Sequence, residues 1–354
     1  MHSLSLHSRL LRTALPRACQ ATRQFSVKPQ VTAAMVKELR ERSGAPMMDC
    51  KKALSAEGVS GDVKLAMDWL RTKGIAKAAS SDRVTKEGLI AVNRSPSGAV
   101  TLLEVNSETD FVSLNRDFQL FVARVSEAVS QHSSSHFGPG PIDIEKLLSL
   151  PAGGEGAGAG SVKDALGDIV SSIRENIVIR RAEVLLPHRE QGAGGSVRVV
   201  ASYVHAKLGV GVVPAHIELG KVAAVVLLQA TGALGQGAEA EAVLTGEVGR
   251  RLAMHVVASQ PSPLYLSIAD VPADVLLQET AIFREQSADD KKKADIVERI
   301  VAGKVAKRMG ELCLLQQAHV AMEGSPVVHK YLESMGADGS TVSLTGFQRW
   351  SLGQ

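Results

Sequence analysis

The feature that most constrains how this chain can fold is a structural unit that its sequence contains twice. Each unit begins with short apolar runs separated by turn-forming residues and ends with a segment whose apolar residues follow helical spacing. Two such units predict two related α+β subdomains, each with a small antiparallel sheet flanked by helices. The predicted strands and helices lie at 89–93, 100–105 and 114–129 in the first unit, and at 197–205, 210–218, 222–229 and 242–257 in the second.

A helical segment precedes the first unit. Thr32 is suited to cap one helix, Pro46 to begin a second, and Asp62 to cap a third. Gly74 is expected to end the third helix. Three short helices in so short a stretch predict a ubiquitin-associated-like bundle over residues 31–80.

The rest of the chain divides into the two subdomains. The first is predicted at 86–195 and contains a glycine-rich linker at 151–160, and the second is predicted at 196–354. Further helices are expected at 144–150, 162–174, 273–285 and 294–313, and TVSLTGFQRWSL near the end of the chain reads as a closing strand.

The N-terminus has an unusual composition. Residues 1–37 contain no Asp or Glu, and residues 1–25 carry four arginines, which is typical of a mitochondrial transit peptide. RQFSV at 23–27 resembles a matrix-processing site, so the mature chain is expected to begin near Ser26. Removing four of the 40 basic residues leaves 36 against 37 acidic residues, so the mature chain loses the positive charge that favours non-specific nucleic-acid binding.

No site for covalent catalysis, a cofactor or a metal ion is predicted. The glycine-rich linker lacks the Lys-Ser/Thr pair of a phosphate-binding loop, because Gly160 is followed by SVK. His132 and His136 lie four residues apart without a third ligand nearby. Cys50 and Cys313 are interpreted as buried thiols. The longest wholly apolar run, 222–228, is too short to span a bilayer.

The loop between the second strand and the first long helix, NSETDFVSLN at 106–115, is the strongest candidate for a functional site. We call it the corner. Phe111 could pack beneath its own sheet, or it could protrude and fill a pocket of a partner protein. Asp110 could bind polar groups of that partner or cap the helix. The sequence of the corner alone leaves both alternatives open.

Several segments, the corner included, resemble the elongation factor Ts family. The resemblance extends from Val31 to the C-terminus, and the N-terminal composition points to the mitochondrial members. The matching segments, in the order that the family has them, are VKELRERSGAPMMDCKKAL (36–54), SETDFV (107–112), ENIVIRR (175–181), MHVVASQP (254–261) and the terminal LTGFQRW.

The resemblance implies a guanine-nucleotide exchange factor for mitochondrial elongation factor Tu, the GTPase that delivers aminoacyl-tRNA. Asp110 and Phe111 match the Asp-Phe pair that in this family wedges against helices of the GTPase and disturbs its magnesium site. Losing the metal removes the charge that holds the β-phosphate of GDP. Thr109 and Val112, which flank the pair, are assigned to the same partner-binding group.

Three further residues are assigned to partner binding by the resemblance. Met47 and Met48 match paired methionines of the family, although either could instead pack in the core of the helical bundle. His205 matches a histidine near the GTPase contact, but AKL follows it here where the family has a glycine-rich sequence. Bacterial members of the family carry a coiled-coil insertion in the C-terminal region, whereas only the charged patch 289–293 is expected in its place here. A dimer built on that insertion is therefore not expected, and a one-to-one complex with the GTPase is predicted.

A binding module is the alternative function. The helical bundle would then bind peptides or RNA, and the remainder would serve as a non-catalytic scaffold. This interpretation leaves TDFV unexplained, and the acidic mature chain disfavours direct nucleic-acid binding. A pull-down from the mitochondrial matrix, the expected location, separates the two interpretations, since an exchange factor should retain the GTPase as its dominant partner. No membrane association is expected.

We predict that the N-terminal segment is removed on import. Sequencing the amino terminus of the protein purified from mitochondria should give a start near Ser26, because the acid-free, arginine-bearing composition ends shortly before the first expected helix. An intact Met1 in the mature protein would contradict this prediction.

Overall fold

The computed structural model describes most of the chain after the N-terminal segment. The described residues are 31–43, 45–79, 85–132, 137, 139–152, 160–190, 196–209, 211–232, 238–287, 294–320, 322–336 and 339–354. The predicted transit peptide at 1–25, most of the glycine-rich linker and the charged patch 289–293 lie outside them. Among the described residues, no helix is both long and apolar enough to cross a membrane.

Three helices form at the N-terminus, as predicted. They are α1 (Ala33–Ser43), α2 (Met47–Leu54) and α3 (Val63–Ala79). The Oγ1 atom of Thr32 accepts a hydrogen bond from the backbone N–H of Met35 at 3.3 Å, and Asp62 accepts from the backbone N–H groups of two residues in the first turn of α3. Leu39, Cys50 and other buried residues make a small core between the helices. The similarity to a ubiquitin-associated domain stays a prediction.

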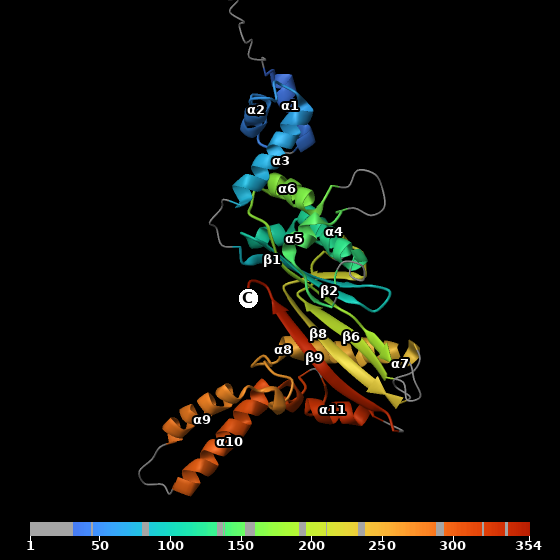
Figure 1. Cartoon of the computed structure of the whole chain (residues 1–354), viewed down its shortest axis with the longest axis vertical. Helices are drawn as coiled ribbons and strands as arrows, with labels where there is room; N and C mark the ends of the chain where they lie inside the picture. Colours follow the sequence, from blue (N-terminus) through green and yellow to red (C-terminus); the bar gives the residue numbers. More distant parts are fainter. Residues whose placement is uncertain are drawn as a thin grey trace, which may run out of the picture.

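The third helix is longer than its sequence suggested. We expected it to end at Gly74, but α3 continues to Ala79. A glycine inside a helix costs only about 1 kcal/mol relative to alanine, and α3 also packs against α6 (Val162–Ile173). This contact joins the bundle to the rest of the protein, so that α1 and α2 lie at one end of a long molecule (Figure 1).

Two antiparallel sheets form the centre, which confirms the predicted mixed fold with small antiparallel sheets flanked by helices. The first has the order β3-β4-β2-β1-β7 and the second the order β5-β6-β8-β9. The first sheet contains β1 (Glu87–Arg94), β2 (Val100–Ser107), β3 (Gly140–Pro141), β4 (Val178–Leu185) and β7 (Ile217–Gly220). The second contains β5 (His188–Glu190), β6 (Ser196–His205), β8 (Val222–Thr231) and β9 (Thr341–Ser351).

The structure differs from the predicted elements in several places. The strand expected at 210–218 is confined to β7, which pairs with β1 in the first sheet although it lies beyond residue 196. Among the strands and α-helices, β3, β5 and α11 (Val328–Met335) were not predicted. The two strands have two and three residues, which is too short to show a periodic apolar pattern.

Helices cover the outer face of each sheet. The first sheet carries α4 (Arg116–His132), α5 (Ile144–Ser149) and α6, and the second carries α8 (Gly249–Ala258) and α11. A β-carbon at Gly249 would lie 2.3 Å from the Cβ atom of Ala201 on β6, so only glycine lets α8 approach this closely. The helix expected at 242–257 is divided into α7 (Ala238–Val243), a π-helical turn η3 (Leu244–Val248) and α8.

The inner faces of the two sheets pack against each other. Val92 of the first sheet and Val225 of the second belong to one buried cluster, which also contains Trp350 near the C-terminus. The carboxylate of Glu104, fully buried in β2, accepts hydrogen bonds from Nε of Arg181 at 2.7 Å and from the backbone N–H of Gly353 at 2.9 Å. These bonds fix the end of the chain to the first sheet and so hold the two sheets together.

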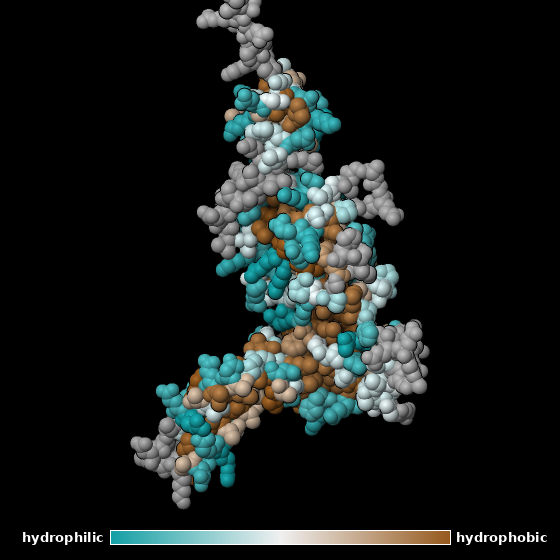
Figure 2. All heavy atoms as spheres, viewed as in Figure 1, coloured by the Kyte–Doolittle hydropathy of each residue, from teal (hydrophilic) through white to brown (hydrophobic). Residues whose placement is uncertain are grey.

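A helical hairpin projects from the second sheet (Figure 1). It consists of α9 (Ala273–Ser287) and α10 (Ala294–Leu312), which pack side by side. Both helices were predicted, at 273–285 and 294–313, but their pairing was not. The expectation that only the charged patch 289–293 stands in place of the coiled-coil insertion is therefore wrong. An apolar cluster lies at the base of the hairpin, Val301 is buried further along α10, and Arg284 and Glu298 form an ion pair at 2.9 Å nearer the tip. In Figure 2 apolar and polar residues are mixed over the hairpin surface, which explains why no coiled-coil pattern marked it.

Two histidines are buried under α11. The backbone N–H of Val320 donates to Nδ1 of His255 at 3.2 Å, so Nε2 of this ring carries the proton and donates to Oε1 of Gln317 at 3.0 Å. The ring of His319 lies 5.0 Å from that of His255, centroid to centroid. Burial lowers the pKa of both rings, that of His319 to about 4. Both rings are therefore neutral at physiological pH.

We predict that acid destabilises this region. Unfolded histidine has a pKa near 6.5, so below this pH the unfolded chain binds protons that folded His319 cannot bind. The free energy of unfolding should fall by about 3 kcal/mol for His319 between pH 6.5 and pH 4, and the loss should level off below pH 4. Chemical denaturation at several pH values measures the slope, which should be shallower in His319→Gln. Equal slopes in the two proteins would exclude this histidine as the cause.

Candidate partner-binding site

The corner is a tightly hydrogen-bonded turn between a strand and a helix. After β2, residues Asp110–Leu114 form the 3₁₀ helix η1. Asn115 then caps α4, because its Oδ1 atom accepts hydrogen bonds from the backbone N–H groups of Asp117 and Phe118 at 2.8 and 3.2 Å. The corner is therefore fixed at its helical end by a side-chain cap.

A pair of glutamates fixes the other end of the corner. Glu175, at the turn after α6, accepts hydrogen bonds from the backbone N–H of Thr109 at 2.9 Å and from its Oγ1 hydroxyl at 2.6 Å. In return Glu108 accepts from the backbone N–H of Asn176 at 2.9 Å. Bonds to ionised carboxylates are stronger than neutral ones. We call these four residues the carboxylate clamp, and it holds the corner against a segment 66–68 residues away in the sequence.

Phe111 points away from the protein. Its side chain is 77% exposed, whereas that of the adjacent Val112 is 3% exposed and packs in the core beneath the first sheet. The alternative that Phe111 packs under its own sheet is therefore wrong. Asp110 is exposed beside it, and Leu114 adds a second exposed apolar side chain one turn further along η1.

The four predicted residues of the corner thus fall into two pairs. Asp110 and Phe111 face solvent, where a partner can contact them. Thr109 is held inward by Glu175, and Val112 is buried. In this conformation Thr109 and Val112 position the exposed pair and offer a partner little or no surface of their own.

The segment that carries His205 lies close to the corner. His205 is exposed at the end of β6, and the loop after it reaches Gly209, which has a positive φ of 71°. A β-carbon at Gly209 would lie 3.3 Å from Oε1 of Gln119. The Nε2 atom of Gln119 donates to the backbone carbonyl of Ser113 in η1 at 2.9 Å. Gln119 is therefore bonded to η1 and lies close to Gly209 in the loop after His205.

The paired methionines are exposed but lie elsewhere. Met47 is 57% exposed and Met48 63% exposed, while Cys50 and Leu54 turn the other face of α2 toward the bundle core. Core packing is therefore wrong for both methionines. Figure 1 shows α2 at the end of the molecule, so both methionines belong to the terminal bundle and not to the corner itself.

The residues that hold the corner were not predicted from the sequence. Glu108 and Glu175 supply the carboxylates of the clamp, and Gln119 is hydrogen-bonded to Ser113 in η1. Both glutamates lie inside the segments SETDFV and ENIVIRR that carry the family resemblance. Their presence in two separate motifs was the available signal, but only the fold shows that the motifs meet.

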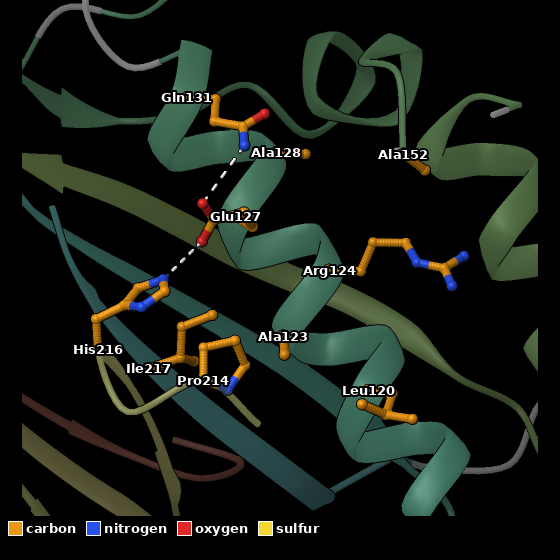
Figure 3. Close-up of a pocket in the computed structure, with 10 residues that line it drawn as sticks. All are labelled: Leu120, Ala123, Arg124, Glu127, Ala128, Gln131, Ala152, Pro214, His216 and Ile217. Atoms are coloured by element: carbon orange, nitrogen blue, oxygen red, sulfur yellow. Dashed lines mark hydrogen bonds and ion pairs between the residues drawn. The ribbon is translucent and has the colours of Figure 1, made fainter. Parts of the chain in front are cut away.

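A cavity of about 470 Å³ lies over the outer side of α4 (Figure 3). Glu127 accepts hydrogen bonds there from Nε2 of His216 at 3.0 Å and from Nδ2 of Asn93 at 3.1 Å. Burial raises the pKa of Glu127 and these hydrogen bonds lower it, with the lowering dominant. Within the described ranges, no three His, Cys, Asp or Glu side chains are grouped to hold a metal ion. No Ser, Thr, Cys or Lys side chain is among the described residues that line the cavity.

Comparison with known proteins identifies the family. The family model described as elongation factor TS matches residues 108–354, which include all of the corner except its first two residues. The chain belongs to the elongation factor Ts family. Elongation factor Ts is a nucleotide exchange factor of translation elongation and does not catalyse covalent chemistry, in agreement with the absence of a predicted catalytic site.

Bacterial elongation factor Ts proteins are similar to nearly the whole chain. That of Rhodospirillum centenum is 39% identical over 327 residues, covering 92% of this chain and 94% of the relative. That of Gluconobacter oxydans is 39% identical, with 92% and 93% covered, and that of Caulobacter vibrioides is 38% identical with the same coverage. These alignments are longer than the family-model match, so they include much of the sequence before the corner.

We predict that truncating Phe111 and truncating its neighbour Val112 have very different effects on the stability of the free protein. Phe111→Ala should leave the melting temperature of the free protein nearly unchanged, because the ring is already in water. Val112→Ala should cost about 1–3 kcal/mol, as truncation of a small buried side chain does. Thermal unfolding of the two variants beside the wild type makes the comparison. A melting temperature for Phe111→Ala as low as that for Val112→Ala would refute the exposed position.

Proposed function

We propose that this member of the elongation factor Ts family binds elongation factor Tu through the corner and promotes release of GDP from it. The observation that carries the proposal is an exposed phenylalanine on a turn held at both ends. Burying a phenylalanine side chain stabilises a complex by about 1.5–3 kcal/mol. Because the turn is already ordered, little of this free energy is lost to ordering on binding.

The proposed mechanism is a linkage between two binding events. Phe111 inserts between helices of the GTPase, and Asp110 acts beside it, so that the conformation holding magnesium and the β-phosphate is disfavoured. The exchange factor and GDP then each weaken the binding of the other by the same factor. His205, at the end of β6, supplies a second contact, and Met47 and Met48 supply a third from the terminal bundle.

We further propose that the protein acts in the mitochondrial matrix on the mitochondrial form of the GTPase. The support is the acid-free, arginine-bearing composition of residues 1–25. The similarity to bacterial relatives is compatible with this location, because it covers 92% of the chain and leaves room for a separate N-terminal segment.

We predict that removing the exposed ring slows exchange without unfolding the protein. Release of fluorescent GDP from the GTPase should be about thirtyfold slower with Phe111→Ala, which corresponds to a loss of about 2 kcal/mol at the transition state. Asp110→Ala should also slow release, and the double variant should lose less than the sum because both residues act on one site. Raised magnesium should oppose the wild-type factor.

A matched control is an equally exposed apolar residue far from the corner. Leu277 on α9 is 71% exposed, and Leu277→Ala should release GDP at the wild-type rate. Unchanged release with Phe111→Ala, at equal concentrations of folded protein, would contradict the proposed role of the corner.

We propose a one-to-one complex with the GTPase, since each chain presents one corner. The same stoichiometry was predicted from the sequence because no helical insertion was expected. The hairpin of α9 and α10 shows that this reason does not hold. Light scattering of the purified complex should give the mass of one factor and one GTPase. A stable two-to-two mass would contradict the prediction and would point to an interface between two factors.

A further inference from the structure

Two large apolar side chains of the corner share one face of η1. Phe111 and Leu114 are three residues apart, and a 3₁₀ helix completes a turn every three residues, so side chains at these positions eclipse each other. At about 2.0 Å of rise per residue, their α-carbons lie about 6 Å apart along the helix axis. Val112 and Ser113, which lie between them in the sequence, are buried. We call Phe111 and Leu114 the apolar ridge.

Hydrogen bonds on both sides of Leu114 hold its backbone in place. The hydroxyl of Ser113 donates to the backbone carbonyl of Asp110 at 2.5 Å, and the backbone carbonyl of Ser113 accepts from Nε2 of Gln119 at 2.9 Å. On the other side, Asn115 caps α4 through its Oδ1 atom. The backbone at Leu114 is therefore ordered before any partner binds, so little free energy is lost to ordering it on binding.

The exposure of the apolar ridge is concentrated in one place. Single exposed apolar side chains are common on protein surfaces and need no function. Within the described part of the chain, five large apolar side chains are more than 60% exposed, namely Met48, Phe111, Leu114, Leu264 and Leu277. Two of these five lie on one turn of η1. Scattered exposure therefore does not describe the ridge, and an apolar surface of a partner would remove both side chains from water together.

We propose that Leu114 is a second anchor of the complex with elongation factor Tu. This inference rests on the function proposed above and adds to it a residue outside SETDFV, the segment whose resemblance assigned Asp110 and Phe111. Because the two side chains of the ridge lie on one face, the GTPase must offer an apolar groove that accepts both of them. A pocket shaped for one aromatic ring would leave Leu114 in water. Leu114 supplies affinity through its burial in this groove.

Calorimetric titration of the full-length factor into nucleotide-free elongation factor Tu tests the proposal. Leu114→Ala should raise the dissociation constant about tenfold, as the loss of an interface anchor does. Leu114→Gln keeps the size of the side chain but not its apolar character and should have a similar effect. Leu114→Met keeps both and should bind within about twofold of the wild type. Leu277→Ala, on an equally apolar and exposed residue of α9, is the matched control and should bind as the wild type does.

A double variant tests whether the two side chains occupy one groove. Phe111→Ala combined with Leu114→Ala should weaken binding by less than the product of the two single effects, because neighbouring side chains in one groove are coupled. A full product would mean that Leu114 makes a separate contact and would overturn the shared groove. Melting temperatures of the free variants should stay close to that of the wild type, since Leu114 is exposed. A clear fall for Leu114→Ala would assign this residue to packing and overturn the proposal.

The outcomes for this inference and for the proposed function are distinguishable. An unchanged dissociation constant for Leu114→Ala, together with slowed GDP release by Phe111→Ala, would overturn the role of Leu114 and leave the proposed function in place. Wild-type GDP release by Phe111→Ala would contradict the proposed function, and the inference would fall with it. The expected result is weaker binding by Leu114→Ala and Leu114→Gln, with recovery in Leu114→Met.

Discussion

The carboxylate clamp is the interaction on which the candidate site depends. Glu175 binds both the backbone and the hydroxyl of Thr109, while Glu108 binds the backbone of Asn176. Beyond the end of β2, other hydrogen bonds of the corner are made within the chain from Ser107 to Gln119, such as that from the Ser107 hydroxyl to the backbone carbonyl of Thr109, whereas the clamp supplies bonds that tie the corner to a distant segment. A large apolar side chain in a mobile loop would be free to fold back onto the protein, whereas on the clamped turn Phe111 stays in solvent.

The two sheets give the clamp a rigid support. Glu108 and Thr109 of the clamp follow β2, whereas Glu175 and Asn176 precede β4. These two strands are neighbours in the first sheet. The buried bonds of Glu104 join the same strands to the end of the chain, and the inner core joins the first sheet to the second. The loop after His205 approaches Gln119 of α4, whose side chain is hydrogen-bonded to η1.

Sequence patterns predicted the elements that have strong periodicity. The long strands and helices were found because their apolar residues repeat at two or at 3.6 positions over many residues. The exposure of Phe111 was left open because the buried Val112 is its neighbour, and no period separates the two faces of a single 3₁₀ turn. Likewise glycine commonly ends a helix, so Gly74 was expected to end α3. Only the contact of α3 with α6 shows why the helix continues.

Long-range contacts could not be predicted from one sequence. Glu175 follows α6, and nothing local indicates that its carboxylate binds a residue 66 positions earlier. The seam of the α9–α10 hairpin was missed for a related reason, because ion pairs supply part of it and its apolar contacts gather at the base. In both places the fold brings together residues whose local sequence is unremarkable.

The most direct test of the account is to open the clamp while keeping the exposed ring. Glu175→Ala removes both hydrogen bonds to Thr109 and leaves Asp110 and Phe111 in place. GDP release from elongation factor Tu should then be at least tenfold slower than with the wild-type factor, although the free variant remains folded by circular dichroism. Release within twofold of the wild-type rate would show that the clamp does not position the ring, and would contradict the account.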